Sequence, residues 1–177
     1  MHIGFITDGN RRWAKENLKP DDDTHIYKYW RETVFKVGNW CKDKGFECTF
    51  FITSINNMTK RTPQEVMEIK YEMQNIINHF LDANDSYGVR LNNHEEKSGD
   101  KYINLLIFYD FKEDCPNIPP IDMMVRTGGD LRLSGFLMKQ CAYSELFFPK
   151  YYFPDLDARR LDELLEQFSS RDRRFGK

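Results

Sequence analysis

The hydrophobic positions of the chain fall into short apolar runs and longer amphipathic segments that follow one another in turn. Short apolar runs bounded by Gly, Pro, Asn or Asp are typical of buried strands. Such runs are found at 2–7, 47–54, 102–109, 122–126 and 145–148, and a shorter candidate is found at 89–91. Uninterrupted apolar strands indicate a sheet that is covered on both faces.

The longer segments carry apolar residues at every third or fourth position, and this spacing predicts helices. One begins at Pro63, which suits the first helical position, and Glu65 lies in its first turn. Another begins at the N-cap candidates 21–24 and ends before Gly45, its expected C′ residue. The predicted helices cover 12–17, 21–44, 62–83, 132–143 and 157–168.

Strands that alternate with helices predict an α/β fold with a mostly parallel central sheet flanked by helices. The length of 177 residues fits a single domain spanning 1–177. The segments 92–101 and 110–121 are polar or rich in proline and predict loops. Because ligands of parallel sheets bind beyond the carboxyl ends of the strands, the residues that follow each strand are the first functional candidates.

Composition excludes several functional classes. The formal net charge of −2 gives no bulk basic field for binding nucleic acid or an anionic membrane surface. The four cysteines lack close metal-ligand spacing and are typical of reduced thiols in the cytoplasm. Asp8 interrupts the first apolar run, so no signal peptide is expected, and no apolar stretch is long enough to span a bilayer. A soluble, cytoplasmic protein is the expectation.

Two junctions that follow predicted strands combine glycine, arginine and carboxylate. The first is Asp-Gly-Asn-Arg-Arg at 8–12, and the second is Arg-Thr-Gly-Gly-Asp-Leu-Arg-Leu-Ser at 126–134. Glycine lets backbone amides approach an anion closely, and a helix N-terminus directs a positive dipole toward it. Arginine binds phosphate oxygens in pairs, and carboxylates can hold Mg²⁺. Two such junctions in one small domain indicate two phosphorylated ligands bound side by side.

These junctions resemble signatures of the cis-prenyltransferase family, which includes undecaprenyl diphosphate synthases and short-chain Z-isoprenyl diphosphate synthases. The family pattern D-G-N-x-R-W-A matches 8–14, and R-T-G-G-[ED]-x-R-[IL]-S-x-F matches 126–136. The patterns A-Y-x-E-L-x-F and R-D-R-R-F-G match 142–148 and 171–176. A looser pattern, S-x-x-N-x-x-x-R, matches Ser54, Asn57 and Arg61. The resemblance covers nearly the whole chain.

The resemblance implies an Mg²⁺-dependent transferase of isoprenoid biosynthesis. The implied reaction condenses an allylic diphosphate, which is dimethylallyl, geranyl or farnesyl diphosphate, with isopentenyl diphosphate to a short-chain cis-prenyl diphosphate. Asp8 and Glu145 would hold Mg²⁺ together. The expected diphosphate-binding residues are Gly9, Arg11, Arg12, His25 and Arg61 for the allylic substrate, and Arg126, Arg132 and Ser134 for the second substrate. The expected catalytic residues, which position the reacting carbons or relay the departing proton, are Asp8, Asn10, Ser54 and Asn57. A homodimer is implied, with membrane contact only through the lipid product.

The chain departs from the family pattern at two places. Asp21 stands where the family usually has an arginine, and Thr24 replaces a glycine before His25. A carboxylate at that position repels a diphosphate, whereas Arg11, in place of the usual glycine, restores positive charge. The segments 91–102 and 109–121 leave room only for loops where family members insert helices. In these departures the chain resembles short-chain and lavandulyl-type members of the family, and this resemblance favours a small product.

Several alternatives remain open from the residues alone. His25 also suits a solvated cap residue, Ser54 an ordinary strand-end hydroxyl, Asn57 a turn former, and Arg61 a solvent-facing charge. Instead of regular condensation, the protein could couple two dimethylallyl diphosphates irregularly. It could also be a non-catalytic accessory subunit of a prenyltransferase. A phosphatase is disfavoured, because no nucleophile with a matching base is present.

Overall fold

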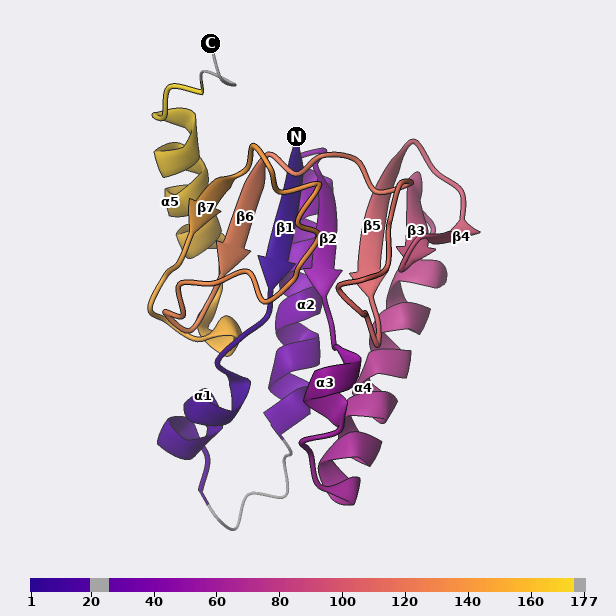
Figure 1. The fold of residues 1–177 in the computed structure, drawn as a ribbon, viewed down its shortest axis with the longest axis vertical. Helices are drawn as coiled ribbons and strands as arrows, with labels where there is room; N and C mark the ends of the chain where they lie inside the picture. The colour runs from indigo at the N-terminus through magenta and orange to yellow at the C-terminus, as the bar shows by residue number, and fades with distance from the viewer. Residues whose placement is uncertain (20–25, 174–177) are drawn as a thin grey trace.

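A computed structural model describes residues 1–19 and 26–173, whose strands form one seven-stranded sheet (Figure 1). The strands are β1 (His2–Ile6), β2 (Glu47–Phe51), β3 (Tyr87–Leu91), β4 (His94–Lys97), β5 (Lys101–Leu106), β6 (Met123–Arg126) and β7 (Glu145–Phe147). Their order across the sheet is β4-β3-β5-β2-β1-β6-β7, and all neighbours are parallel except β3 and β4. The predicted mostly parallel sheet is therefore confirmed.

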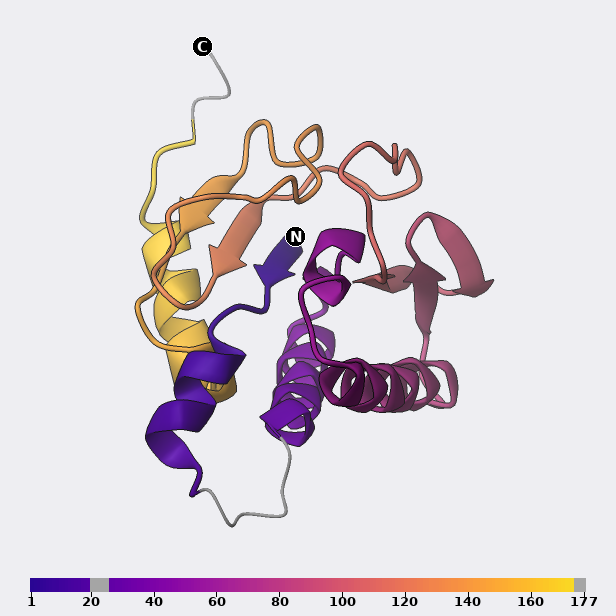
Figure 2. The same ribbon diagram turned by 60° about the horizontal axis from the view of Figure 1, so that its bottom comes forward.

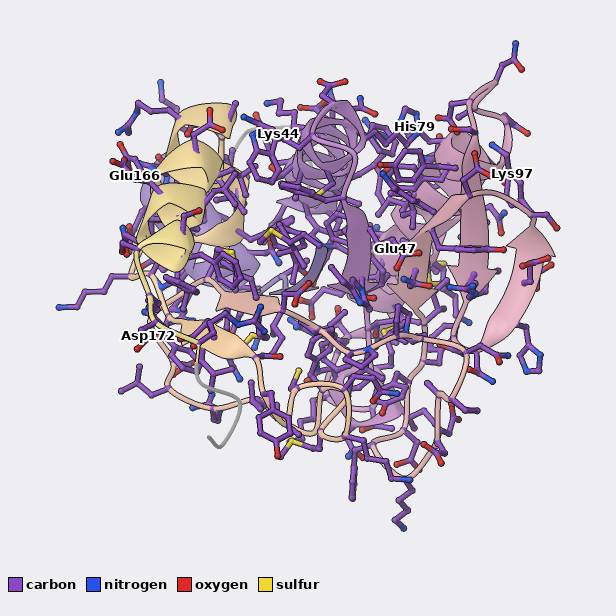
Figure 3. The ribbon with its side chains drawn as sticks, turned by 90° about the horizontal axis from the view of Figure 1, so that it is seen from above. Lys44, Glu47, His79, Lys97, Glu166 and Asp172 are labelled. Atoms are coloured by element: carbon purple, nitrogen blue, oxygen red, sulfur yellow. The ribbon has the colours of Figure 1, made fainter. Side chains whose placement is uncertain are left out.

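The described helices pack mainly against one face of this sheet. They are α1 (Asn10–Asn17), α2 (Ile26–Asp43), α3 (Ile55–Met58), α4 (Pro63–Leu81), α5 (Ala158–Ser169) and the short 3₁₀ helix η1 (Phe153–Asp155). Figure 3 looks along the strands and shows α2, α4 and α5, marked by Lys44, His79 and Glu166, in one layer.

Local signals set the ends of the long helices. Thr62 and Glu65 form a capping box at the start of α4, with Pro63 in the first turn. Gly45 has a φ of 69° after α2 and ends that helix, as predicted. The N-cap candidates at 21–24 lie outside the described residues. None of the described helices has the length and apolar composition needed to cross a membrane.

The two faces of the sheet carry separate cores. Phe5 and Phe50 are stacked 5.3 Å apart, between their ring centroids, on the face covered by the helices. The next residues along these strands, Ile6 and Phe51, belong to a second cluster with Phe136. Because side chains alternate along a strand, the neighbouring residues serve opposite faces. All four cysteines are buried and free, as expected.

The second face is covered by irregular segments, and the helix predicted at 132–143 is not formed. Residues 134–143 adopt successive turns instead. Ser134, Gly135 and Leu137 have φ values of 52°, 81° and 33°, which an α-helix cannot contain. A Cβ on Gly135 would lie 2.5 Å from the Cβ of Phe111, so the turn allows close packing there. The helix predicted at 132–143 is therefore wrong, whereas the sheet is covered on both faces as expected.

The loop predicted after Leu91 contains the short strand β4, which pairs antiparallel with β3. Its sequence, His-Glu-Glu-Lys, is polar because the strand lies at the sheet edge, so hydrophobic pattern could not reveal it. Asn92, with a φ of 53°, forms the turn between the two strands. Its side chain donates to the Ile107 carbonyl at 3.1 Å and accepts from the Ile107 amide at 2.8 Å. The hairpin is thereby tied to the end of β5.

Candidate active site

A pocket of about 650 Å³ opens at the carboxyl ends of β1, β2 and β6. Figure 2 turns this edge forward and shows α1 and α3 following β1 and β2. Of the predicted site residues that the structure describes, all except Glu145 line the pocket, and His25 lies outside the described residues. The predicted residues that line it are Asp8, Gly9, Asn10, Arg11, Arg12, Ser54, Asn57, Arg61, Arg126, Arg132 and Ser134.

Arg126, the last residue of β6, is the centre of one side of the pocket. Only 4 % of its surface is exposed, and its Nη2 donates to Asp8 Oδ2 at 2.7 Å. Its Nη1 donates to the Arg132 carbonyl at 2.5 Å and to Ser134 Oγ at 2.8 Å. Thr127 Oγ1 donates to the Asp8 carbonyl at 2.7 Å, which joins the end of β6 to the end of β1. This guanidinium is held rigidly by buried contacts.

Asp8 is an anion in this environment. Burial alone would raise the pKa of its carboxyl, but other contacts together lower the pKa below its usual value. These contacts are the hydrogen bond and charge of Arg126, the amide of Gly9 at 2.6 Å and the charge of Arg12. Paired cations and amide donors stabilise a carboxylate in this way. Asp8 is therefore charged near neutral pH and available as a metal ligand.

Asp130 is a second pocket carboxylate, and the sequence analysis did not select it, although the second signature contains an acid at this position. Its Oδ2 lies 3.6 Å from Arg12 Nη2, 3.6 Å from Arg126 Nη2 and 3.0 Å from Arg132 Nη2. We call Asp8, Arg12, Arg126, Asp130, Arg132 and Ser134 the Arg126 cluster. Its arginines exceed its carboxylates, so the cluster carries positive charge for an anionic ligand.

The glycines of the second junction shape this cluster without offering free amides. Gly128 N donates to the Tyr151 carbonyl and Gly129 N to the Pro149 carbonyl, so neither amide is available to a ligand in this arrangement. A Cβ on Gly128 would lie 2.7 Å from Arg12 Nη2, and Arg12 Nη1 donates to the Gly128 carbonyl at 2.9 Å. Glycine is thus needed at 128 so that Arg12 can approach.

The other side of the pocket contains a second cationic group. Arg11 and Arg61 line it together with Tyr27 from the start of α2. The Tyr27 hydroxyl donates to Glu65 Oε1 at 3.1 Å, and Arg61 Nη1 lies 3.4 Å from the same oxygen. We call Arg11, Tyr27, Arg61 and Glu65 the Arg61 cluster. Sequence reasoning missed Tyr27, which was part of an apolar stripe, and took Glu65 only as a helix-start residue.

Amide and hydroxyl groups line the same pocket as the two clusters. Asn10 Nδ2 donates to the Thr7 carbonyl at 2.8 Å, whereas its Oδ1 is buried and has no hydrogen-bond partner among the described residues. Ser54 Oγ accepts from the amide of Asn57 at 3.2 Å and caps the short helix α3. A buried oxygen without a partner is costly unless a ligand satisfies it. Asn10 Oδ1 is therefore a candidate ligand contact.

The pocket also has an apolar wall, formed in part by Trp30, Ile52 and Ile69. Trp30 is 3 % exposed, and its Nε1 donates to Thr7 Oγ1 at 3.1 Å. Thr7 Oγ1 in turn donates to the Phe51 carbonyl at 3.0 Å, so the indole is fixed against two strands. An apolar wall beside two cationic clusters suits ligands with a diphosphate head and a hydrocarbon chain.

The structure does not bring Glu145 to Asp8 within one chain. Glu145 is level with Met123 on β6, which is level with Ile3 on β1, and Asp8 lies five residues beyond Ile3. At the rise of a strand this places the two acids roughly 15 Å apart along the sheet. The Glu145 carboxylate instead accepts a hydrogen bond from Arg171 at 2.7 Å. The predicted Asp8–Glu145 metal pair is corrected, because the register of β6 and β7 separates the two carboxylates.

The remaining donors still fit Mg²⁺. Among the described residues no group of three or more His, Cys, Asp or Glu side chains is placed to hold a metal. Mg²⁺ is usually held by one or two carboxylates together with substrate phosphates, and such a protein site needs few residues. Asp8 and Asp130 both lie 3.6 Å or less from Arg126 Nη2, so their carboxylates share one side of the pocket.

The family model described as putative undecaprenyl diphosphate synthase matches residues 6–99 and 92–176. A tritrans,polycis-undecaprenyl-diphosphate synthase (geranylgeranyl-diphosphate specific) of Pyrococcus abyssi is 29% identical over 233 residues, covering 99% of this chain and 86% of the relative. An isoprenyl transferase of Treponema denticola is 30% identical over 222 residues, covering 99% and 96%. Both alignments exceed the 177 residues of this chain, so these relatives carry segments with no counterpart here.

Two solved structures share the fold. A probable undecaprenyl diphosphate synthase from Campylobacter jejuni superposes with a TM-score of 0.73 at 21% identity, covering 99% of this chain and 98% of that chain. Lavandulyl diphosphate synthase from Lavandula x intermedia, in complex with dimethylallyl diphosphate, gives a TM-score of 0.81 at 17% identity with the same coverage.

Proposed function

Because the chain belongs to the cis-prenyltransferase family, a family of prenyl transferases, we propose that it condenses an allylic diphosphate with isopentenyl diphosphate to a short-chain cis-prenyl diphosphate. The allylic substrate is dimethylallyl, geranyl or farnesyl diphosphate. The observation that carries this proposal is one pocket that is lined by both arginine clusters and by apolar side chains such as Trp30, Ile52 and Ile69. One diphosphate occupies each cluster.

Arg126, Arg132 and Ser134 of the Arg126 cluster receive isopentenyl diphosphate, whereas the Arg61 cluster and the start of α1, which includes Arg12, receive the allylic diphosphate. Two observations support this division. Arg126, Arg132 and Ser134 come from one segment and interact with one another. Arg11 and Arg61 lie on the other side of the same pocket, near the first residues of α1. Helix N-termini favour anions, although α1 is short and its contribution is small.

The reaction follows from this placement. The allylic C–O bond breaks, the diphosphate leaves with the electron pair, and a C–C bond forms to the terminal alkene carbon of isopentenyl diphosphate. A proton then leaves the isopentenyl fragment, and the product contains a new double bond. Arginines fixed before the reaction stabilise the charge that develops on the leaving group. Holding both substrates together also removes much of the entropy cost of their encounter.

Asn10, Ser54 and Asn57 position the reacting carbons or relay the departing proton. These roles are supported by the presence of all three residues in the pocket that both clusters line, and by the Oδ1 of Asn10, which has no partner among the described residues. Asp8, with Asp130 beside it, would hold Mg²⁺, which when bound neutralises diphosphate oxygens. The homodimer implied by the family resemblance and the cytoplasmic location both remain predictions.

Product analysis tests the proposal. Purified protein is incubated with Mg²⁺, isopentenyl diphosphate and dimethylallyl or geranyl diphosphate, and products are identified by mass spectrometry against a reaction with the Asp8→Ala variant. We expect a short cis-prenyl diphosphate from the wild type only. A product formed from dimethylallyl diphosphate alone indicates irregular coupling. Binding of both diphosphates without any product supports the non-catalytic accessory subunit and overturns the proposal.

A further inference from the structure

Tyr27 occupies an unusual position for a buried aromatic residue. Only 5 % of its surface is exposed, yet it lines the pocket beside Arg61 and Arg11. Its ring packs edge-on against Trp30, with the centroids 6.3 Å apart, so the phenol is held in a defined direction. Burial raises the pKa of Tyr27 to about 12, and the hydroxyl therefore stays a proton donor at neutral pH. A fixed donor between two arginines suits a phosphate oxygen.

Glu65 accepts the hydrogen bond of the Tyr27 hydroxyl in this structure. Its Oε1 lies 3.1 Å from the Tyr27 hydroxyl and 3.4 Å from Arg61 Nη1, and its Oε2 accepts from the Thr62 amide at 3.2 Å. This carboxylate thus neutralises the arginine that a diphosphate needs. An acid beside an anion site weakens binding unless the ligand displaces it.

We propose that the Tyr27 hydroxyl donates to the diphosphate in the Arg61 cluster, exchanging the Glu65 carboxylate for a phosphate oxygen. Glu65 thereby sets the affinity of this side of the pocket for the allylic diphosphate. The inference rests on the proposed function for the assignment of the two substrates. Tyr27 would thus supply a hydrogen-bond donor for the diphosphate in a chain that has Asp21 where the family usually has an arginine.

The two residues predict opposite effects on binding. Tyr27→Phe removes only the hydroxyl and should weaken the affinity for an allylic diphosphate about tenfold, the worth of one hydrogen bond to a charged group. Glu65→Gln keeps the capping box, since Gln serves there as well as Glu, but removes the competing charge. We expect this variant to bind the allylic diphosphate about three- to tenfold more tightly.

The test is calorimetric titration with dimethylallyl S-thiolodiphosphate, which resists ionisation, so that binding is measured without turnover. Tyr29→Phe and Glu68→Gln are matched controls, because each makes the same change on α2 or α4 at a residue that does not line the pocket. Both controls should bind like the wild type. Isopentenyl diphosphate should bind all variants equally.

The proposal is overturned if Tyr27→Phe leaves the Kd of the thiolodiphosphate unchanged, or if Glu65→Gln weakens binding. It is also overturned if Tyr27→Phe weakens isopentenyl diphosphate equally, because Tyr27 is assigned to one cluster only. Failure of the proposed function has a different signature. In that case the variants can show the expected shifts in Kd while the wild type forms no condensation product.

Discussion

The two arginine clusters of the pocket differ in how the fold holds them. The Arg126 cluster is built on the ends of adjacent parallel strands, and the Arg126 side chain is 5% exposed and bonded at 2.5 to 2.8 Å. The Arg61 cluster stands where helices begin, and the Arg61 side chain is 19% exposed with its carboxylate partner at 3.4 Å. The contacts that hold Arg126 are therefore shorter and more buried than the contact that holds Arg61 to Glu65.

The difference suggests separate tasks for the two sides. A preorganised cluster binds a substrate without rearrangement and positions it accurately. A cluster with an internal competitor can exchange partners when its substrate arrives and departs. We therefore expect substitution of the buried Arg126 to reduce stability and turnover together, and substitutions in the Arg61 cluster or at the exposed Arg132 to change mainly the affinity for one substrate.

The largest effect is expected for Arg126→Met. Removing the guanidinium leaves Asp8 and Asp130 without their shared buried cation, so the free energy of unfolding should fall by about 3 kcal/mol. Turnover should fall at least about a thousandfold. Urea unfolding and steady-state kinetics measure the two changes. Arg171→Met is the control, because its partner Glu145 lies outside the pocket. If the turnover of Arg126→Met stays within tenfold of the wild type, the contrast drawn between the Arg126 cluster and the Arg61 cluster is wrong.

Asp8→Asn should reduce kcat by about a hundredfold or more while isopentenyl diphosphate still binds. The substitution preserves shape but removes the charge that can hold Mg²⁺. Single-turnover kinetics and a titration of Mg²⁺ separate chemistry from binding. If kcat stays within threefold of the wild type, Asp8 has no part in the reaction and the Arg126 cluster serves only to bind.

Trp30→Ala tests the apolar wall of the pocket, which Trp30 forms together with Ile52 and Ile69. Removing the indole should let products grow by one or two isoprene units, because the apolar end of the pocket becomes deeper. Trp40→Ala, another buried tryptophan of α2 outside the pocket, is the control for the loss of stability, which we expect to be about 3 kcal/mol in both variants. Mass spectrometry of the products gives the answer. Identical product lengths in the wild type and Trp30→Ala would exclude this wall as the limit.

Acid should weaken the Arg126 cluster in a defined direction. The folded-state pKa of Asp8 lies below its ordinary value of 3.8, so its contribution to stability is present above that value and is lost as pH falls through the lower folded pKa. Unfolding free energies measured from pH 6 downward should therefore decrease below about pH 4, with a smaller slope in Asp8→Asn than in the wild type. Equal slopes would show that the Arg126 contact adds no stability.

The smallest effect is expected for Arg132→Lys. The Arg132 side chain is 62% exposed and contacts Asp130 through two nitrogens, at 3.2 and 3.0 Å. Lysine keeps the charge but cannot form the paired contact, so KM for isopentenyl diphosphate should rise about threefold to tenfold with kcat nearly unchanged. If KM for the allylic diphosphate changes more than KM for isopentenyl diphosphate, the assignment of Arg132 to isopentenyl diphosphate is wrong.

Local signals allowed much of the fold to be predicted from the sequence. The start of α4 and the end of α2 depend on a capping box and on Gly45, which are readable from neighbouring residues. The segment 134–143 could not be predicted, because its amphipathic spacing favours a helix while close packing of Gly135 on Phe111 favours turns. The edge strand β4 was missed because a polar strand has no apolar signal.

The candidate site, like the fold, could be predicted from the sequence only in part. Residues that follow strands, such as Asp8 and Arg126, were predicted because parallel strands bring their carboxyl ends to one edge. The separation of Asp8 from Glu145 depends on strand register across three strands, which the sequence pattern does not contain. The contact between Tyr27 and Glu65 depends likewise on how α2 packs on α4.

Simultaneous binding of two diphosphates tests the account most directly. The protein is first saturated with dimethylallyl S-thiolodiphosphate in the presence of Mg²⁺ and is then titrated with isopentenyl diphosphate by calorimetry. We predict that one further equivalent binds per chain, with a Kd equal to or lower than that measured without the first ligand. A Kd that rises in proportion to the concentration of the thiolodiphosphate would show competition for one site and would contradict the assignment of the two clusters.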